Sequence, residues 1–577
     1  MLATELQQSN HQLTFDWGHH VLLTSNSPFD LAQNEQFVVI VDGEIRPYGS
    51  QSKPGSSAAL LLTLLGEYPN DFYGKLAGFF NAIIYDLTHN KIMLINDHIG
   101  SRALYYQLTN GDLIISTSLD LFESSTLLLN QQAIFNYFSY HCIAAPTTIY
   151  QNIFKLEAGQ CVSIDSTGEL TDELIYLPSY NYSQESNGTL YKTCRDKIAQ
   201  AVAGQVNGHC GAFLSGGLDS STVAGMLANN ITPAKTFSIG FESKQYDESE
   251  YAELTARHFS TQHYSHVMQP DELVENFKQV ASYFDQPFGN SSAMAAYRCA
   301  VFAKEHGVTK LLAGDGGDEI FAGNERYARQ AVFEPFNRAP SVAKKLLEGM
   351  FCHTPLAKIP LGRKAASYIN QAKMPLPERL DSHSFLNCFP HEEIFTPEFL
   401  SQVNPEQPTQ QKRKRYHNAN SDSQIESMLF LDWKFTLADN DLVKVSKMCE
   451  LAGVEVSYPL LEKELVDFSC QIKDTEKLKG NYLRHFFKHA MQGFLPEETL
   501  SKEKHGFGLP FGLWMTQSPE LMKMAQSALE AMKKRNIFNT EFIELALLKH
   551  QSEHSGYYGE LIWIVVILEL WLESRGL

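Results

Sequence analysis

The sequence lacks the cysteine spacing and the long apolar segments that mark several classes of protein. Its nine cysteines include no CxxC pair, so we expect reduced, mostly buried thiols in a reducing compartment. The longest apolar run, Leu561–Leu568, is far shorter than the roughly 20 residues that cross a bilayer, and it is typical of a buried terminal helix. The first residues, MLATELQQSNHQ, have no signal-peptide pattern. These features predict a cytoplasmic protein without a membrane partner.

Basic residues are also scarce. The chain has 47 Lys and Arg residues against 66 Asp and Glu residues, a formal charge of −19. Nucleic-acid binding depends on Lys and Arg side chains that contact phosphates. We therefore expect no nucleic-acid partner, and an RNA-modifying role is disfavoured. The one basic run, Lys412–Arg415, lies among polar residues and is interpreted as a solvated loop.

The length of 577 residues predicts more than one domain, because single hydrophobic cores stop growing at roughly 250–300 residues. Residues 1–185 are expected to form a β-rich domain, with helices interrupting the strands and a polar linker at Ser179–Gly188. The expected strands are Phe37–Val41, Phe80–Tyr85, Lys91–Ile95 and Leu113–Ser116, and the expected helices are Ala58–Leu65 and Gln132–Tyr140.

Residues 190–577 have a different pattern, in which short apolar strands alternate with helices up to about residue 325 and helices follow. Such alternation predicts a parallel sheet with helices on both faces, which binds ligands at the carboxyl ends of its strands. The expected strands are Gly211–Leu214, Thr236–Phe241, His263–Val267 and Lys310–Ala313, and the expected helices are Ser220–Ala228, Glu248–Phe259, Asp271–Phe284 and Ala293–Lys304.

The octapeptide 214–221, LSGGLDSS, follows a predicted strand and opens a predicted helix. It is not a GxxxxGK[ST] phosphate loop, but the physical reasons for which such a loop binds phosphate apply to it as well. Small residues allow the backbone to approach phosphates, and the exposed N–H groups at the start of a helix favour an anion. Ser215, Ser220 and Ser221 add hydroxyl donors. Asp219 would repel phosphate unless a cation lay between them, so the octapeptide predicts Mg²⁺ as well as a nucleotide.

A second motif, GDGGDE at 314–319, ends the predicted strand Lys310–Ala313. Its acidic residues are expected at the same edge of the sheet as the octapeptide. Asp318 could complete the Mg²⁺ site with Asp219, and Asp315 could face a second substrate.

These two motifs, about 100 residues apart, resemble the synthetase domain of the asparagine synthetases, which belongs to the PP-loop pyrophosphatases. Further segments are similar to family segments in the family's order and cover nearly all of residues 190–577: TFSIGF, YDESEYA, FDQPFGNSSA, LVKVSKM, VEVSYPLLEKELVDF, GFLPEETLSKEKHGFGLP and LELW. The resemblance implies a ligase that converts ATP to AMP and pyrophosphate, forms an acyl-adenylate and transfers the acyl group to an amine.

The resemblance also implies roles for individual residues. The 214–221 loop, including Leu214, Gly216 and Gly217, would hold pyrophosphate, and Asp219 and Asp318 would hold Mg²⁺. Ile239 and Gly314 would frame the adenosine, and Asp315 stands where asparagine synthetases carry a Glu near the acyl-adenylate. Arg484 aligns with a Lys that contacts pyrophosphate; its planar fork differs from a compact ammonium. Lys444 and Lys504 are further cationic candidates, and departures at Asp285–Ser292 and Ser446–Lys447 put the substrate in doubt.

Residues 35–120 resemble the family's glutaminase domain, an N-terminal-nucleophile αββα sandwich, through VDGE at 41–44 and LAGFFNAIIYDLTHNKIMLINDHIGSRALYY at 76–106. Active relatives use a Cys exposed as residue 1. Here Leu2 disfavours removal of Met1, the first cysteine is Cys142, and Asp42 replaces an oxyanion-hole amide. The segment before Asp42 is also shorter than in the family. We therefore expect a reduced domain without glutamine hydrolysis, unless the true start lies upstream.

Several alternatives stay open on the sequence alone. β-Lactam synthetases and lasso-peptide cyclases also combine a synthetase domain with a degenerate glutaminase domain, and they use an amine within the substrate. The chain is therefore expected to join a small-molecule or peptide carboxylate to ammonia or another amine, with ATP and Mg²⁺. A nucleotide-binding scaffold without activity is the remaining alternative. A homodimer is expected by analogy with the family only.

Overall fold

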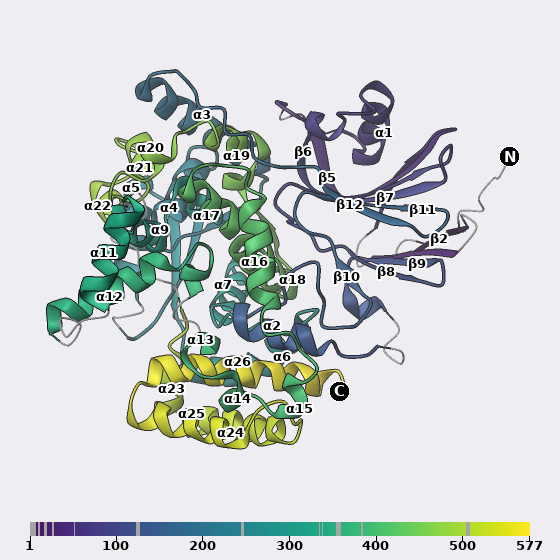
Figure 1. Cartoon of the computed structure of the whole chain (residues 1–577). Helices are drawn as coiled ribbons and strands as arrows, with labels where there is room; N and C mark the ends of the chain where they lie inside the picture. The colour runs from purple at the N-terminus through teal and green to yellow at the C-terminus, as the bar shows by residue number, and fades with distance from the viewer. Residues whose placement is uncertain are drawn as a thin grey trace.

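A computed structural model represents the protein. It describes residues 7–577 except 10–11, 17–19, 26–27, 51, 53, 123–126, 244–246, 334, 337–338, 353–358, 382–384 and 503–507. Lys504 therefore lies outside the described residues, as do Met1 and Leu2. The architecture is a two-domain α/β fold, with β-sheets at the amino-terminal end and a parallel sheet surrounded by helices after it (Figure 1).

Two six-stranded sheets form the amino-terminal part. One has the order β1 (Gln7–Ser9), β2 (Gln12–Asp16), β3 (His20–Thr24), β9 (Asp112–Ser116), β8 (Tyr105–Thr109) and β10 (Phe154–Lys155). The other has the order β12 (Leu170–Leu174), β11 (Gln160–Asp165), β7 (Lys91–Asn96), β6 (Leu76–Asp86), β5 (Phe37–Pro47) and β4 (Asp30–Gln33). The pairing is antiparallel except between β3 and β9.

The alternation of side chains along these strands divides them between two cores. Val38 and Ile40 of β5 pack between the sheets with residues such as Leu23 of β3 and Ile115 of β9. Their neighbours on β5 face the opposite way, toward helix α1 (Ser57–Glu67). The sequence pattern predicts only Phe37–Val41 as a strand, because Asp42 and Glu44 interrupt the apolar run. In the structure, β5 continues to Pro47.

The third sheet is parallel and has the order β15 (Gln262–Val267), β14 (Lys235–Gly240), β13 (Cys210–Phe213), β16 (Lys310–Leu312) and β17 (Glu455–Ser457). The chain moves outward from β13 to β15 through α4 (Leu218–Ala228) and α5 (Ser249–Phe259). It returns to β16 through α6 (Pro270–Tyr283) and α7 (Ala293–Glu305). Since such crossovers are right-handed, the reversal places the two helix pairs on opposite faces. The predicted strand–helix alternation is confirmed.

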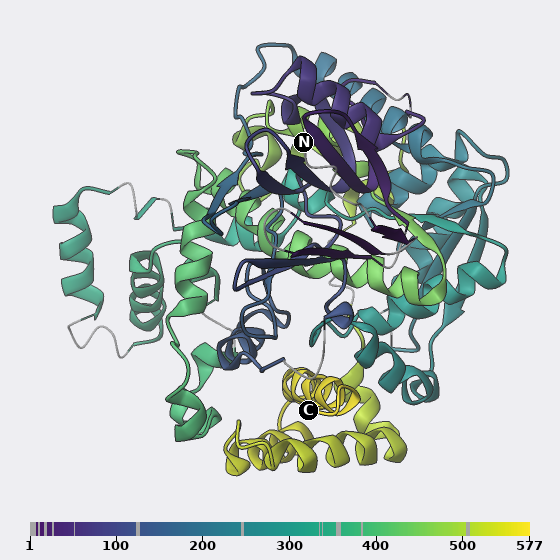
Figure 2. The ribbon, with the colours of Figure 1, turned by 90° about the vertical axis from the view of Figure 1, so that its right-hand side faces the viewer.

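The remaining helices surround this sheet. Figure 2 shows α11 and α12 standing out from the body, while α23 to α26 form a layer at the carboxyl end. Their bounds are α2 Gln131–Tyr140, α3 Asn187–Gln205, α8 Gly317–Phe321, α9 Glu325–Ala331, α11 Ser341–Cys352, α12 Pro360–Lys373, α13 Phe385–Cys388, α14 His391–Ile394, α15 Pro397–Leu400, α16 Gln407–His417, α17 Gln424–Asp432, α18 Leu442–Ala452, α19 Lys463–Ser469, α20 Asp474–Lys477, α21 His485–Ala490, α22 Glu497–Ser501, α23 Phe511–Gln517, α24 Pro519–Lys533, α25 Thr540–Ser552 and α26 Ser555–Ser574.

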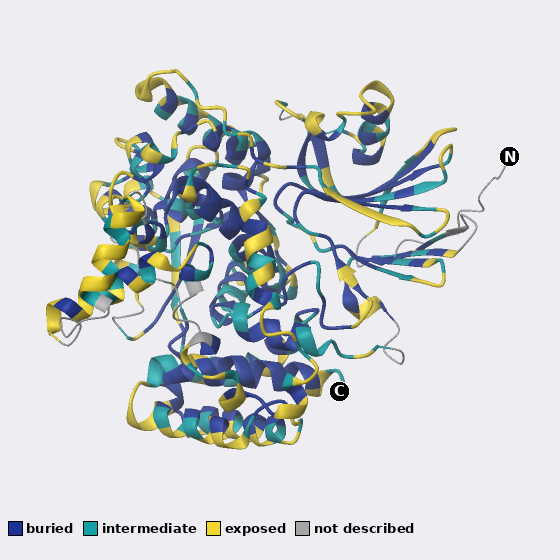
Figure 3. Cartoon of the chain, in the orientation of Figure 1, coloured by how far each residue is buried: buried dark blue, intermediate teal, exposed yellow. Residues whose placement is uncertain are grey.

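Helix α26 is long and apolar enough to cross a membrane by length and composition, but 78% of its apolar window is buried inside the protein. Trp563 and Trp571 are among the most deeply buried side chains of the chain. Tyr137 of α2 donates a hydrogen bond to the carbonyl of Ile564 at 2.8 Å, which ties the helix to the amino-terminal half. Figure 3 shows the same burial along the helix. The predicted buried terminal helix is confirmed, as is the burial of most cysteines.

A π-helix, Trp433–Asp441, joins the two halves of the molecule. Its Asp439 is buried and accepts hydrogen bonds from Lys155 Nζ at 3.0 Å and Arg415 Nη1 at 2.9 Å. Burial raises the pKa of Asp439, but the two cations outweigh burial and hold that pKa below its usual value. Lys434 in the same helix donates to the carbonyl of Ala158, and burial lowers its pKa to about 7. Buried contacts of Asp439 with Lys155 and Arg415, and of Lys434 with Ala158, therefore hold the two domains together.

The interpretation of Lys412–Arg415 as a solvated loop was wrong. The segment belongs to helix α16, and Arg415 is only 3% exposed. Its guanidinium pairs with Asp439 and lies 3.9 Å from the centre of the Phe435 ring. The partners of Arg415 come from distant parts of the chain, so the polar composition of its own surroundings gave no sign of its burial.

We expect Asp439→Asn to lower the free energy of unfolding by about 3–5 kcal/mol, because it leaves buried Lys155 without its carboxylate and Arg415 with only its longer pair to Glu157, at 3.4 Å. Urea unfolding of the full chain measures the effect. The matched control is Asp196→Asn, which removes an exposed pair with Lys192 and should leave stability nearly unchanged. Equal effects of the two substitutions would show that the buried cluster contributes no special stability.

Candidate functional site

The parallel sheet reverses its strand order between β13 and β16, and a cavity of about 990 Å³ opens there. Crevices at such reversals are where open α/β sheets bind ligands. The 214–221 loop follows β13 and the 314–319 loop follows β16, so both predicted motifs reach the cavity. Of the predicted site residues, those that line it are Leu214, Ser215, Gly217, Asp219, Ser220, Ile239, Gly314, Asp315, Asp318, Lys444 and Arg484.

The first loop turns sharply into α4. Gly216 has φ +73°, and a Cβ there would lie 2.4 Å from the backbone nitrogen of Ala252. The hydroxyl groups of Ser215 and Ser220 form a hydrogen bond of 3.0 Å across the turn. Helix α4 begins after Gly217 without a side-chain cap, so its first N–H groups are available to an anion in the cavity.

Two predicted residues of this loop do not line the cavity. Ser221 is fully buried, and its hydroxyl lies 3.1 Å from that of Thr255 on α5. Gly216 lies against Tyr251 and Ala252 and shapes the turn from behind. The sequence alone could not separate Ser220 from Ser221, because the direction of each side chain depends on where α5 packs.

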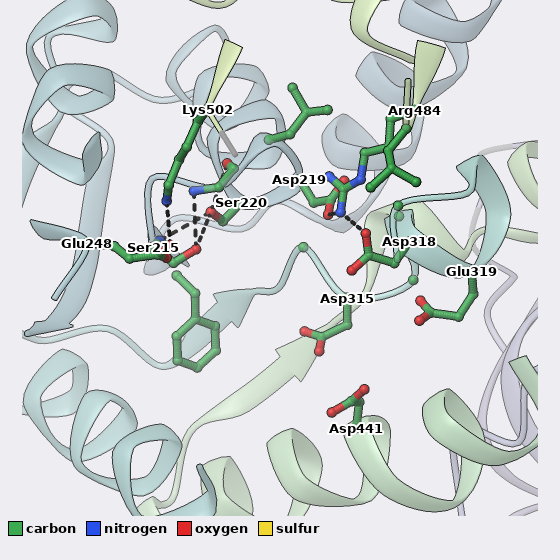
Figure 4. A pocket seen from close by; sticks show the side chains of 18 of the residues that line it. Ser215, Asp219, Ser220, Glu248, Asp315, Asp318, Glu319, Asp441, Arg484 and Lys502 are labelled. Carbon is green, nitrogen blue, oxygen red and sulfur yellow. Dashed lines mark hydrogen bonds and ion pairs between the residues drawn. The ribbon is translucent and has the colours of Figure 1, made fainter. Parts of the chain in front are cut away.

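The second loop lies directly against the first. A Cβ on Gly317 would lie 2.1 Å from Asp219 Oδ1, so any larger residue would displace the carboxylate. This contact brings Asp219 and Asp318 to the same part of the cavity (Figure 4). Arg484, which precedes α21, lies between them: its Nη2 is 2.8 Å from Asp219 Oδ2 and also contacts Asp318 Oδ1.

The carboxylate pair suits a magnesium ion. Asp219 Oδ1 is buried and has no hydrogen-bond partner among the described residues, so one oxygen is available as a ligand. Mg²⁺ in nucleotide sites is held by one or two carboxylates together with substrate phosphates and water. Within the described ranges there is no group of three or more His, Cys, Asp and Glu residues that could hold a metal ion.

A second group of charges lies further along the cavity, where Figure 4 shows Asp315 and Asp441 facing each other. Lys444 Nζ is 2.7 Å from Asp441 Oδ1. Burial raises the pKa of Asp315 to about 6, against the attraction of Lys444 and with a contribution from the Asp441 charge. Burial lowers the pKa of Lys444, but the carboxylates of Asp441 and Asp315 outweigh it and raise that pKa overall.

Asp441, Glu248 and Lys502 are among the polar residues of the site that sequence reasoning missed. Asp441 ends the π-helix three residues before Lys444, a spacing that places both on one helical face. Glu248 and Lys502 form an ion pair of 2.8 Å at the other end of the cavity. Glu248 and Lys502 lie in YDESEYA and GFLPEETLSKEKHGFGLP, two segments that resemble the family. That resemblance was the signal by which the sequence could have indicated them.

The segment 285–292, where the sequence departs from its relatives, mainly holds the domains together. Asp285 is buried and accepts hydrogen bonds from Tyr105 at 3.2 Å and Ser118 at 2.6 Å, both in the amino-terminal half. Gln286 bonds to the backbone of Ile149. Ser292 lines the cavity, so only the end of the segment reaches it.

The amino-terminal domain carries a different arrangement around Asp42. That carboxylate is buried in β5 and forms an ion pair with Arg102 Nη1 at 3.0 Å. Cys142 is buried at the end of α2, and burial raises the pKa of its thiol to about 12. A thiol in that state is a poor nucleophile.

Comparison with known proteins finds a matching family for each of the two parts of the chain. The family described as asparagine synthase matches residues 193–573, and the glutamine amidotransferase domain matches residues 31–175. "Asparagine synthetase [glutamine-hydrolyzing] 1" of Bacillus subtilis is 26% identical over 93% of this chain and 86% of its own length. A putative asparagine synthetase of Methanocaldococcus jannaschii is 26% identical over 79% and 89% of the two chains. Amidase chry2 of Gibberella zeae is 21% identical over 90% and 83%.

The fold and the matches together define a two-domain α/β ligase, with a glutamine-amidotransferase-like domain followed by a parallel-sheet domain that carries the cavity. Since the first match spans well over half of the residues, the chain belongs to the asparagine synthase family. Family membership supports an ATP-dependent amide ligase in general.

We expect Gly216→Ala to destabilise the protein by more than about 2 kcal/mol, since an alanine in the left-handed region costs roughly 1–2 kcal/mol and its Cβ would also meet the Ala252 backbone. Denaturant unfolding measures the loss. Gly208→Ala is the control, because a Cβ there meets nothing within 4 Å. Equal stability of the two variants would contradict the described turn.

Proposed function

We propose that the protein is an AMP-forming amide ligase that activates a carboxylate with ATP and transfers it to ammonia or another amine, without hydrolysing glutamine. One observation carries the proposal: the serine-rich start of α4 and the Asp219–Asp318 pair meet in a single cavity at the reversal of the sheet. This combination offers N–H and hydroxyl donors to phosphate next to carboxylates that suit a cation.

In the first half-reaction, a carboxylate oxygen of the substrate attacks the α-phosphorus of ATP. The P–O bond to the β-phosphate breaks, giving an acyl-adenylate and pyrophosphate. Ser215, Ser220 and the N–H groups of α4 bind the leaving pyrophosphate, and Arg484 supplies a positive charge beside it. Ile239 and Gly314 line the adenosine end. Asp219 and Asp318 would hold Mg²⁺, which neutralises the charge that develops on the phosphates.

In the second half-reaction, the amine nitrogen attacks the acyl carbon, and the carbon–oxygen bond to AMP breaks. The nitrogen loses a proton, and Asp315 is the group placed to accept it. A pKa of about 6 leaves Asp315 ionised at neutral pH while making it a better base than an ordinary aspartate. Lys444 holds its positive charge between Asp315 and Asp441.

The proposed loss of glutamine hydrolysis rests on two features of the amino-terminal domain. The Asp42 carboxylate would oppose the negative charge of a tetrahedral intermediate, and its ion pair with Arg102 fills that position. Cys142 is a buried thiol with a raised pKa. We propose that residues 1–185 form a reduced αββα sandwich of N-terminal-nucleophile type that supports the synthetase domain, residues 190–577.

A cyclising or peptide-joining ligase is the second candidate. The cavity of about 990 Å³ lies at the upper end of the roughly 300–1,000 Å³ range of ligand pockets, and Glu325, Arg329 and Tyr482 also line it. An amine within a larger substrate would then replace ammonia. We place the enzyme in the cytoplasm and expect no nucleic-acid partner, on the charge and composition of the chain.

The reaction is tested by mass spectrometry of AMP, pyrophosphate and asparagine after incubation with MgATP and aspartate, with either ammonium or glutamine. We expect asparagine from ammonium and none from glutamine. Asp318→Asn should reduce AMP formation by about 100-fold, since it removes a charge that stabilises the transition state; Asp196→Asn serves as the control. Asparagine from glutamine would contradict the inactive amino-terminal site. AMP without asparagine would indicate adenylation that leads to another product, and the absence of both products would favour the cyclising candidate.

The role of Asp315 predicts a pH dependence. The pKa is raised to about 6, so the base is ionised above pH 6, and amide formation should fall about tenfold per pH unit below it. Asp315→Asn should abolish amide formation but keep ATP–pyrophosphate exchange, whereas Asp315→Glu should retain both reactions. Asp315 would be excluded as the base if amide formation by Asp315→Glu did not fall at acid pH, or if Asp315→Asn still formed the amide.

A further inference from the structure

Arg484 sits where a divalent cation would be expected. The residue has φ +55° and immediately precedes α21, and its side chain is nine-tenths buried. One nitrogen, Nη2, contacts both Asp219 and Asp318. A single positive group therefore neutralises the two carboxylates that are proposed to hold Mg²⁺.

The guanidinium and a metal ion cannot share this position. A magnesium ion needs the same carboxylate oxygens at about 2.0–2.1 Å, and the repulsion between two cations is strong in a partly buried site. Gly323 closes the other side: a Cβ there would lie 2.1 Å from Arg484 Nε. The guanidinium lines the cavity, so movement away from the carboxylates toward the cavity is open to it.

The cavity supplies a reason for that movement. The triphosphate of ATP would bring negative charge to the start of α4, which lies beside Arg484 in the same cavity. Lys488, one helical turn after Arg484, also lines it; burial and then repulsion by Arg484 lower the pKa of Lys488. Moving the guanidinium onto phosphate would relieve that repulsion and free both carboxylates.

We propose that Arg484 takes the place of the metal ion in the nucleotide-free enzyme and transfers to the phosphates when the metal–nucleotide complex binds. The inference rests on the proposed function and adds an order to it: the free metal ion binds weakly, and it binds tightly only together with nucleotide.

The test measures Mn²⁺ binding by electron paramagnetic resonance, with the full chain and no turnover. Wild-type protein should bind Mn²⁺ weakly alone and at least about tenfold more tightly with α,β-methylene-ATP, a difference of about 1.4 kcal/mol. Arg484→Met should bind Mn²⁺ alone at least about tenfold more tightly than wild type, and Arg484→Lys should lie between them. Adding Asp318→Asn to Arg484→Met should remove that binding.

The control is Arg257→Met, which removes an exposed arginine paired with Glu253 and should leave Mn²⁺ binding unchanged. Thermal unfolding with and without Mn²⁺ checks that each variant is folded. The single variant Arg484→Met should be stabilised by the free ion. Tight Mn²⁺ binding by nucleotide-free wild-type protein, or no gain in Arg484→Met, would overturn the inference. Failure of the nucleotide analogue to bind any variant would instead count against the proposed function.

Discussion

The structure depends on the buried pairing of Asp439 with Lys155 and Arg415. Lys155 belongs to the amino-terminal domain, Arg415 to α16 and Asp439 to the π-helix, so one carboxylate joins three separate parts of the chain. A buried charge is tolerated only when it is fully paired, which makes the relative position of these parts specific. Two residues further on, Asp441 ends the π-helix inside the cavity. The domain contact and the geometry of the site are therefore set by the same helix.

This connection gives the amino-terminal domain a structural role that does not depend on glutamine hydrolysis. Its strands and loops supply Lys155, Tyr105 and Ser118, each of which bonds to a buried carboxylate of the synthetase half. Arg46 of β5 likewise pairs with Glu462 and Glu464. None of these contacts depends on a catalytic nucleophile. Removal of the domain would expose the acids that they satisfy, so the domain has a structural reason to remain.

The cavity itself combines two kinds of electrostatics. At the start of α4, open N–H groups and hydroxyls favour an anion, and the nearby carboxylates are held by Arg484. Around Asp315 and Asp441, carboxylates outnumber the single Lys444 and favour a protonated amine. Under the proposed function, the acyl-adenylate, a mixed anhydride, and an amine that loses its proton as it attacks would meet these opposite surroundings, and the two regions lie along one cavity.

The sequence by itself determined the two glycine- and serine-rich motifs, the strand–helix alternation that places them at one edge of a sheet, and membership of the family. These are local patterns, since turns and helix starts depend on residues close in the chain. Only the tertiary structure decided that Ser221 points away from the cavity, that Arg415 is buried and that Asp441 faces Asp315. It also decided that Arg484 lies between Asp219 and Asp318, which are 265 and 166 residues before it. Such contacts depend on how distant helices pack, and no pattern within one segment records that packing.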